Sequence, residues 1–119
     1  MNTLNLLLVA LGGALGSVAR YLVSTMAIAQ LGAGFPWGTL GVNVLGSAAI
    51  GIAAGLGVQG EARLLIVTGF LGGFTTFSAF SLETSALFER AWWLAAVYVG
   101  ASLTLGLGAY ALCYGLLRR

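Results

Sequence analysis

Residues 72–81 read GGFTTFSAFS and place two glycines, four hydroxyl side chains and three phenyl rings inside a strongly hydrophobic chain. Serine and threonine side chains compete with the backbone for helical hydrogen bonds, and the glycines leave the backbone conformationally free. The segment therefore predicts a break in a membrane helix. Non-helical backbone at membrane depth is tolerated only where protein or water covers it, and its exposed N–H groups and carbonyls can bind ions. The expected chemistry is ion binding.

Two of the phenyl rings, Phe77 and Phe80, lie three residues apart and should project to one side of the helix that follows the break. The electropositive edge of a phenyl ring can approach an anion without offering it a charge. Ordinary core packing is the alternative, and it would be the better interpretation for isolated phenylalanines. The neighbouring break and the buried Asn43 of another stretch make core packing a weaker interpretation here.

Polar side chains also follow two other apolar stretches at four-residue spacing. Thr39, Asn43 and Ser47 share one face of a helix in the second stretch. Tyr98 and Ser102 repeat the spacing in the fourth stretch. A primary amide is costly in hydrocarbon unless both of its ends are satisfied, so Asn43 indicates a polar interior or pathway. For each hydroxyl, a hydrogen bond to a carbonyl four residues earlier or to another helix stays open as the alternative.

A charged side chain, Arg20, lies well inside the first apolar stretch. Placing an arginine there costs at least ~2.5 kcal/mol, so it must face protein or water. Two interpretations stay open. Arg20 lines a vestibule and raises the local anion concentration, or it is a structural arginine that snorkels or bonds to backbone carbonyls.

Length and composition identify the elements that must position these residues. The 119 residues are 60% hydrophobic and 7% charged, with a mean hydropathy of +1.02, which is typical of a membrane protein. Charges and turn formers divide the sequence into four stretches, each close to the ~20 residues needed to cross a bilayer. We expect one all-α integral membrane domain over residues 1–119, with spans at about 4–29, 38–58, 62–87 (broken near 72–77) and 91–116.

The charged residues exclude several classes of protein. Five arginines are set against three glutamates, and the chain has no lysine, aspartate or histidine. The net charge of +2 comes from scattered residues, so nucleic acid is not an expected partner. Most side chains used for metal ligation or acid–base catalysis are missing, and the single Cys113 cannot form an internal disulfide. We therefore expect no enzymatic activity.

The nineteen glycines are too many for lipid-facing helix surface, and several recur at four-residue spacing, as in Gly12 and Gly16 or Gly51 and Gly55. Small residues let helix backbones approach each other in a bilayer. Packing within the chain and packing between subunits are both open interpretations. Four helices can hardly enclose a path while also covering the polar groups, so we expect at least a homodimer.

Three segments resemble, in order and spacing, the signatures of the CrcB/Fluc family of fluoride channels: GGALGSVARY (12–21), GTLGVNVLGS (38–47) and GFLGGFTTFSAFSLE (69–83). The resemblance covers essentially the whole chain. It implies a dual-topology homodimer of four-span subunits, inserted antiparallel in the cell inner membrane, with the third helix broken. It also implies two fluoride pathways and one central structural sodium ion (Na+) per dimer. The implied role is passive export of fluoride, which reduces its toxicity.

The resemblance implies roles for individual residues along the fluoride pathway. Phe77 and Phe80 look like the paired phenylalanines of the family, and Asn43 looks like the amide donor beside them. The further residues implied along or at the end of the path are Ser78, Thr39, Tyr98, Ser102 and Glu83.

Other positions match the family outside the path. Arg20 matches the arginine of a wide aqueous vestibule, and the backbone carbonyls of Gly72 and Thr75 occupy the positions that hold the sodium ion in the family. Gly106 departs from the pattern, because a further hydroxyl is common there.

Physical chemistry favours uncharged donors for such an ion. Fluoride is small and tightly hydrated, so several close donors must replace its water, whereas a single fixed cation would bind it too firmly to permit exit. Two alternatives remain. A small four-span multidrug or cation transporter would need a carboxylate within the membrane, and residues 1–30 contain no acidic residue. A non-transporting membrane assembly subunit would leave the polar rows without a purpose.

Overall fold

The computed structural model describes residues 2–118, and helices are the regular elements of that part of the chain. Four stretches are helical, long and apolar enough to cross a membrane: Thr3–Leu31, Trp37–Leu56, Gly60–Arg90 and Trp92–Leu117. The predicted all-α fold with four membrane spans is confirmed. The chain is a multi-pass membrane protein.

Three spans are single helices, and the third span consists of several elements. The single helices are α1 (Thr3–Leu31), α2 (Trp37–Leu56) and α6 (Trp92–Leu117). The third span begins with α3 (Gly60–Arg63) and continues as the π-helix η1 (Leu64–Leu71), then α4 (Gly72–Phe74) and α5 (Ser78–Arg90). Residues 75–77 lie between α4 and α5 and are not helical.

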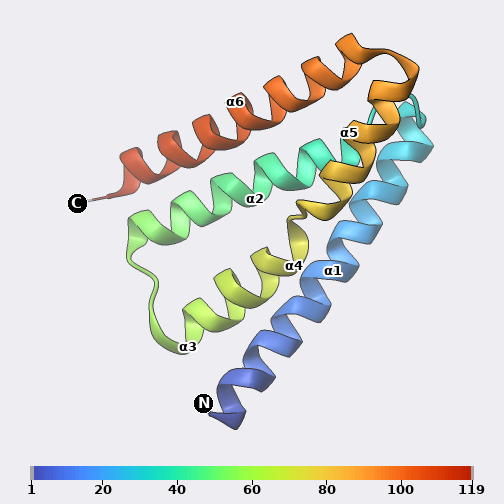
Figure 1. Ribbon diagram of the computed structural model, residues 1–119. Helices are drawn as coiled ribbons and strands as arrows, with labels where there is room; N and C mark the ends of the chain where they lie inside the picture. Colours follow the sequence, from blue (N-terminus) through green and yellow to red (C-terminus); the bar gives the residue numbers. More distant parts are fainter. Residues whose placement is uncertain (1, 119) are drawn as a thin grey trace.

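The helices form two packed pairs that share the third span (Figure 1). Helix α2 packs against α6, while α1 packs against η1 and α4, and α5 packs on α6. Both chain ends lie at one end of the molecule, opposite the α1–α2 and α5–α6 connections (Figure 1). The third span therefore passes from the α1 side of the molecule to the α6 side at residues 75–77.

Local sequence explains where the helices begin and end. The Asn2 side chain accepts a hydrogen bond from Leu4 N–H at 2.8 Å, which satisfies one of the free donors at the start of α1. Gly32 and Gly57 follow α1 and α2 with φ of 82° and 74°, a backbone conformation that favours glycine. Pro36 comes directly before the first residue of α2, where its missing N–H costs nothing.

Glycines let α1 and the third span pack backbone against backbone. Gly12 and Gly16 are the buried residues of α1. A Cβ at Gly12 would overlap Leu65 O, and one at Gly73 would lie 2.6 Å from Gly13 O. On the other pair of helices, a Cβ at Gly51 would lie 2.6 Å from Tyr110 O. These glycines therefore serve packing within the chain, one of the two interpretations that the sequence left open.

This close packing predicts a specific loss of stability. Gly16→Ala is expected to lower the melting temperature of the detergent-solubilised protein, because the new Cβ would overlap the backbone carbonyl of Phe70. Overpacking of this kind costs about 1–3 kcal/mol. Gly100→Ala is the matched control, since nothing lies within 4 Å of a Cβ there. Equal melting temperatures for the two variants in a thermal unfolding series would contradict the prediction.

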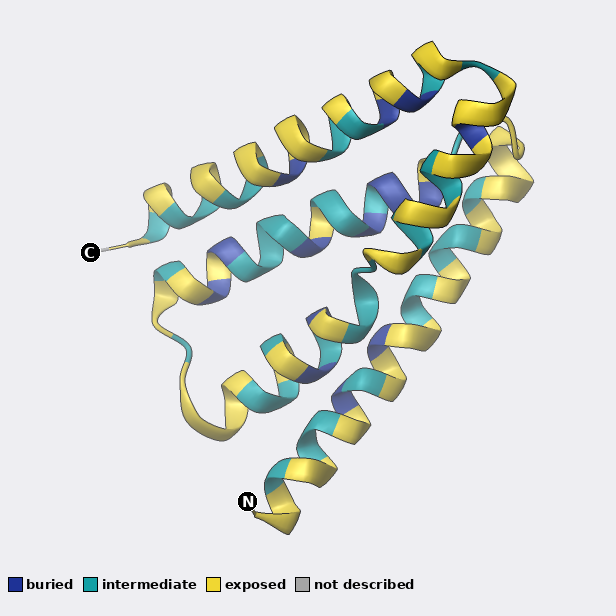
Figure 2. Ribbon diagram, in the orientation of Figure 1, coloured by how far each residue is buried: buried dark blue, intermediate teal, exposed yellow. Residues whose placement is uncertain are grey.

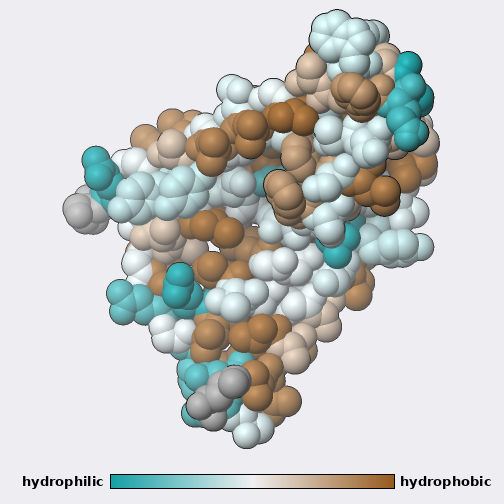
Figure 3. Space-filling model, viewed as in Figure 1, coloured by the Kyte–Doolittle hydropathy of each residue, from teal (hydrophilic) through white to brown (hydrophobic). Residues whose placement is uncertain are grey.

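Burial is concentrated at a few points along the helices. Leu40, Leu87, Ala95 and Tyr98 form a buried cluster where α2, α5 and α6 meet. Most other faces carry exposed residues (Figure 2), and apolar side chains cover much of the outer surface (Figure 3). Such a surface suits lipid or a second membrane subunit rather than water. The buried cluster gives a fixed support to the side chains that pack against it from α2, α5 and α6.

Candidate functional site

The backbone between α4 and α5 leaves the helical path at Thr75, which is extended with φ −89° and ψ 157°. In a continuous α-helix, Thr76 N–H would bond to Gly72 O, and the next N–H would bond to Gly73 O. Thr76 N–H instead donates to Asn43 Oδ1 at 2.8 Å, and Arg20 Nε donates to Gly73 O at 3.0 Å. Side chains from α1 and α2 thus bond to backbone groups at the interruption.

Asn43 bonds to both sides of one residue. Its Oδ1 accepts from Thr76 N–H, and its Nδ2 donates to Thr76 O at 3.0 Å. The amide is partly buried, and both of its ends are satisfied, which removes most of the cost of placing it within the membrane. This reciprocal pair fixes the non-helical segment against α2.

The hydroxyl of Thr76 caps the helix that follows. Its Oγ1 accepts a hydrogen bond from Ala79 N–H at 3.1 Å and lies 3.3 Å from Ser78 Oγ. Ala79 N–H would otherwise bond to Thr75 O in a continuous helix. The helical donors of Gly72 O and Thr75 O are therefore both diverted to side-chain oxygens, Asn43 Oδ1 and Thr76 Oγ1.

The role expected for glycine flexibility at this point is wrong. Gly72 has ordinary right-handed helical angles, φ −62° and ψ −35°, and the glycines of residues 2–118 with positive φ lie elsewhere. The helix ends because Asn43 and Thr76 compete for backbone N–H groups. Gly73 is needed for a different reason, the close approach of α1 at Gly13 O.

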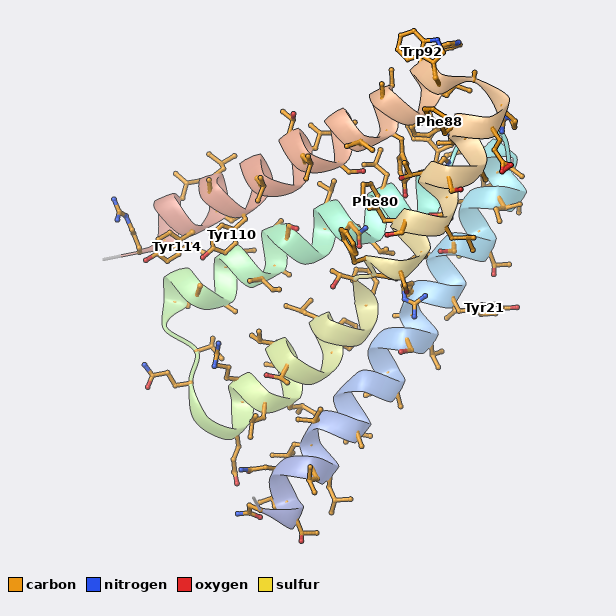
Figure 4. All side chains as sticks on the ribbon, viewed as in Figure 1. Tyr21, Phe80, Phe88, Trp92, Tyr110 and Tyr114 are labelled. Atoms are coloured by element: carbon orange, nitrogen blue, oxygen red, sulfur yellow. The ribbon has the colours of Figure 1, made fainter. Side chains whose placement is uncertain are left out.

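Three aromatic rings follow one another away from the interruption. Phe77 is 78% exposed, and its ring centroid lies 5.6 Å from that of Phe80. Phe80 is half-buried against the α2–α5–α6 cluster, with its ring 5.1 Å from the Tyr98 ring. Figure 4 labels Phe80 and Phe88, which both belong to α5; Phe80 packs against the buried cluster, whereas Phe88 is 65% exposed. Each ring pair is tilted, so ring edges as well as faces line this row.

The polar residues predicted on α2, α5 and α6 lie beside the same rings. The Tyr98 hydroxyl donates to Glu83 Oε1 at 3.1 Å, and the Tyr98 side chain is fully buried. Thr39 is 4% exposed. Ser102 Oγ is buried and has no hydrogen-bond partner within residues 2–118. The single Tyr98 proton is directed at Glu83, whereas the Ser102 hydroxyl keeps a free donor within the described residues.

Three other hydroxyls bond to backbone carbonyls of their own segment, which was the alternative to a role in a pathway. Thr75, Ser81 and Thr84 each donate to the carbonyl four residues earlier, at 2.9, 3.0 and 2.7 Å. Such bonds satisfy a hydroxyl within its own helix. These side chains are therefore occupied locally.

Arg20 and Gly106 also have defined surroundings. Arg20 is partly buried, and its side chain bonds to a backbone carbonyl. This contact agrees with the interpretation of Arg20 as a structural arginine that bonds to backbone carbonyls. Gly106 is buried on α6, and the Cβ of an alanine there would lie 3.6 Å from Ser47 Oγ on α2. The Ser47 hydroxyl of α2 thus lies next to Gly106, the position on α6 where a hydroxyl is common in the family.

The structure brings the candidate residues into two adjoining groups. Around the interruption lie Arg20, Asn43, Gly72 and Thr75, with Ser78 and Phe77 at its exposed side. In the bundle interior lie Phe80, Tyr98, Glu83, Thr39 and Ser102. Sequence reasoning missed the central role of Thr76. A threonine shortly before a predicted helix start is the kind of capping residue that would have directed attention to it, and its Oγ1 accepts from Ala79 N–H in the first turn of α5.

Comparison with known proteins identifies the family. Residues 7–115 match the family described as "CrcB-like protein, Camphor Resistance (CrcB)". The chain belongs to the CrcB family. A Rhizobium etli protein named "Fluoride-specific ion channel FluC" is 53% identical to it over 109 residues, which cover 87% of each chain. The resemblance to the CrcB/Fluc family stated from three motifs is confirmed.

Further CrcB family relatives carry the same name. The Agrobacterium fabrum protein is 52% identical over 112 residues, covering 89% of this chain and 90% of its own. The Hyphomonas neptunium protein is 49% identical over 110 residues, covering 87% of each. These CrcB family members are named as ion channels, which are not enzymes, so the chain belongs to a non-enzymatic family as expected.

Proposed function

We propose that this protein is a fluoride channel that lets the ion leave the cell passively across the inner membrane, which reduces fluoride toxicity. The observation that carries the proposal is the Asn43–Thr76 pair at a non-helical segment within a membrane span, next to the Phe77 and Phe80 rings. The fluoride-specific names of the relatives support the same function.

Asn43 is suited to present a donor to the ion. A primary amide carries two N–H bonds on one nitrogen, and Asn43 uses one of them on Thr76 O. The other remains for fluoride, at an amide whose orientation is fixed by two hydrogen bonds. Ring edges of Phe77 and Phe80 and the Ser78 hydroxyl supply further uncharged contacts near the interruption. Such contacts replace hydration without holding the ion too tightly to leave.

The path continues in our proposal through the bundle interior. Ser102 Oγ has a free donor, and Thr39 and Tyr98 lie on the adjoining faces of α2 and α6. Glu83 orients the Tyr98 hydroxyl and stands at the end of the path. Arg20, which is held by its bond to Gly73 O, would stand near the opposite end of the path, where the family resemblance implies a vestibule.

A dual-topology homodimer with two pathways completes the proposal. Phe77 is 78% exposed and Ser78 is exposed, although both adjoin backbone that must be shielded from lipid. A second subunit inserted antiparallel would provide that shield. The exposed apolar surface of the helices is compatible with such an interface and with lipid around it.

The freed carbonyls fit a structural sodium ion at the centre of the dimer. Gly72 O and Thr75 O have lost their helical donors, and carbonyls released at broken helices are ligands for Na+. Two subunits would supply two such pairs. The ion would supply positive charge that offsets these acceptors.

Thr75→Ser is expected to leave sodium dependence and fluoride flux within about twofold of wild type. Serine retains the backbone carbonyl and the hydroxyl that bonds to Leu71 O, and it loses only the methyl that contacts Gly46. Flux would be compared in sodium and in N-methyl-D-glucamine buffers. A sodium response lost in this variant would assign the ligand to the side chain.

Ion release from proteoliposomes tests the function itself. Vesicles loaded with potassium fluoride and treated with valinomycin should release fluoride quickly and chloride hardly at all. Proton movement driven by a cationic drug would support the small multidrug transporter instead. Vesicles that release no ion would support the non-transporting assembly subunit.

A further inference from the structure

The α1–α2 connection and the end of α5 lie together at one end of the molecule (Figure 1). Residues of these segments line a cavity of about 140 Å³. Its wall includes Ser24, Phe35, Thr39, Glu83, Leu87 and Arg90. Thr39 and Glu83 belong to the proposed fluoride path, so the cavity adjoins the end of that path. Arg90 has no role in the path as described above.

Two opposite charges line this cavity and have different partners. Glu83 and Arg90 are seven residues apart on α5, so they share a helix face and lie about 10 Å apart along the axis. Glu83 accepts from the Tyr98 hydroxyl, whereas Arg90 donates from Nη1 to Gly34 O at 3.0 Å. The cavity therefore lies between a fixed carboxylate and a fixed guanidinium.

The position of Glu83 creates an electrostatic difficulty for an anion channel. A half-buried carboxylate at the end of the path repels an approaching fluoride ion, and repulsion is stronger where water is partly excluded. Its hydrogen bond to Tyr98 holds the carboxylate in place. An anion needs a compensating positive charge at the same mouth.

Arg90 has the properties that this compensation requires. Its side chain is exposed, whereas Glu83 is half-buried, so an ion from solution meets the guanidinium first. Within residues 2–118, Arg90 uses one of its five N–H donors, on Gly34 O. The exposure of the guanidinium to water keeps anion binding weak enough for passage.

We propose that Arg90 is the residue that admits anions to the Glu83 end of the channel. Its charge offsets the Glu83 carboxylate and raises the fluoride concentration in the cavity that both residues line. This inference rests on the proposed fluoride channel function. It assigns Arg90 a role in conduction rate, with ion selection left to the amide and rings deeper in the protein.

The test compares Arg90→Gln, which removes the charge, with Arg90→Lys, which keeps it. Fluoride release from proteoliposomes would be measured at low ionic strength and again with N-methyl-D-glucamine gluconate at about 0.5 M on both sides. We expect Arg90→Gln to be roughly tenfold slower than wild type at low ionic strength, and Arg90→Lys to stay close to wild type. At high ionic strength the difference should shrink, because salt screens exposed charges.

Arg63→Gln is the matched control, since it removes the same charge from an exposed position at the start of the third span. Its flux should equal that of wild type. An Arg90→Gln variant that conducts at the wild-type rate would overturn the inference. So would an Arg90→Lys variant as slow as Arg90→Gln, because the effect would then come from the contact with Gly34.

Wild-type protein alone provides a further check if Arg90→Gln fails to fold. Its fluoride release should slow several-fold as impermeant salt is added, and a rate independent of salt would overturn the inference. Failure of the proposed function is a separate result. In that case wild-type vesicles would release no fluoride at any ionic strength.

Discussion

Asn43→Asp is expected to reduce fluoride release by about 100-fold or more and to destabilise the protein. Aspartate keeps an oxygen for Thr76 N–H, but it places a second oxygen against Thr76 O where Asn43 Nδ2 now donates. An acceptor then faces an acceptor, and a buried carbonyl is left unsatisfied, which costs about 1–3 kcal/mol. The variant also removes the N–H proposed to meet the ion. Flux and melting temperature would both be measured.

Ser47→Ala is the control on the same helix face. Ser47 lies four residues after Asn43, and its Oγ would be 3.6 Å from a Cβ added at Gly106 on α6. Its flux and melting temperature should stay near wild-type values. Wild-type flux in Asn43→Asp would remove the amide from the mechanism, whatever the change in stability.

Phe80→Ile is expected to be the second severe change, with fluoride release lowered by about 100-fold and the fold retained. Isoleucine keeps much of the apolar volume against the α2–α5–α6 cluster. It removes the ring that lies between Phe77 and Tyr98, at 5.6 and 5.1 Å between centroids. The electropositive edges that link the interruption to the interior would then be lost.

Phe88→Ile is the matched control, because Phe88 is on the same helix but 65% exposed on the outer surface (Figure 4). It should release fluoride at the wild-type rate. Elution volume on size exclusion would verify that both variants keep the wild-type assembly. Full flux through Phe80→Ile and also through Phe77→Ile would exclude the rings from the path.

The sequence was sufficient to predict the number of spans and the family, because length, apolar runs and three motifs are local properties. It also identified Asn43 as a group that needs two partners. The partner itself, the backbone of Thr76, lies 33 residues away and depends on how α2 meets the third span. No local pattern contains that information.

Two other features were also beyond the sequence. The π-helix of η1 covers LLIVTGFL, an apolar run that an α-helix would bury equally well. Gly72 was expected to be conformationally flexible, yet it has helical backbone angles. Side chains that compete for backbone hydrogen bonds determine where α4 ends. The sequence prediction used both the glycines and the hydroxyls of residues 72–81, whereas the contacts that end α4 join distant helices.

The order of synthesis gives the contacts at residues 73–76 a further meaning. Arg20 and Asn43 belong to α1 and α2, which leave the ribosome before the third span does. Arg20, which donates to Gly73 O, and Asn43, which bonds to the N–H and carbonyl of Thr76, are therefore already in the bilayer when that span is inserted. The non-helical segment of the third span can then meet its partners on arrival. Defects at Arg20 or Asn43 should therefore appear during biogenesis as poor integration of a span that itself carries no mutation.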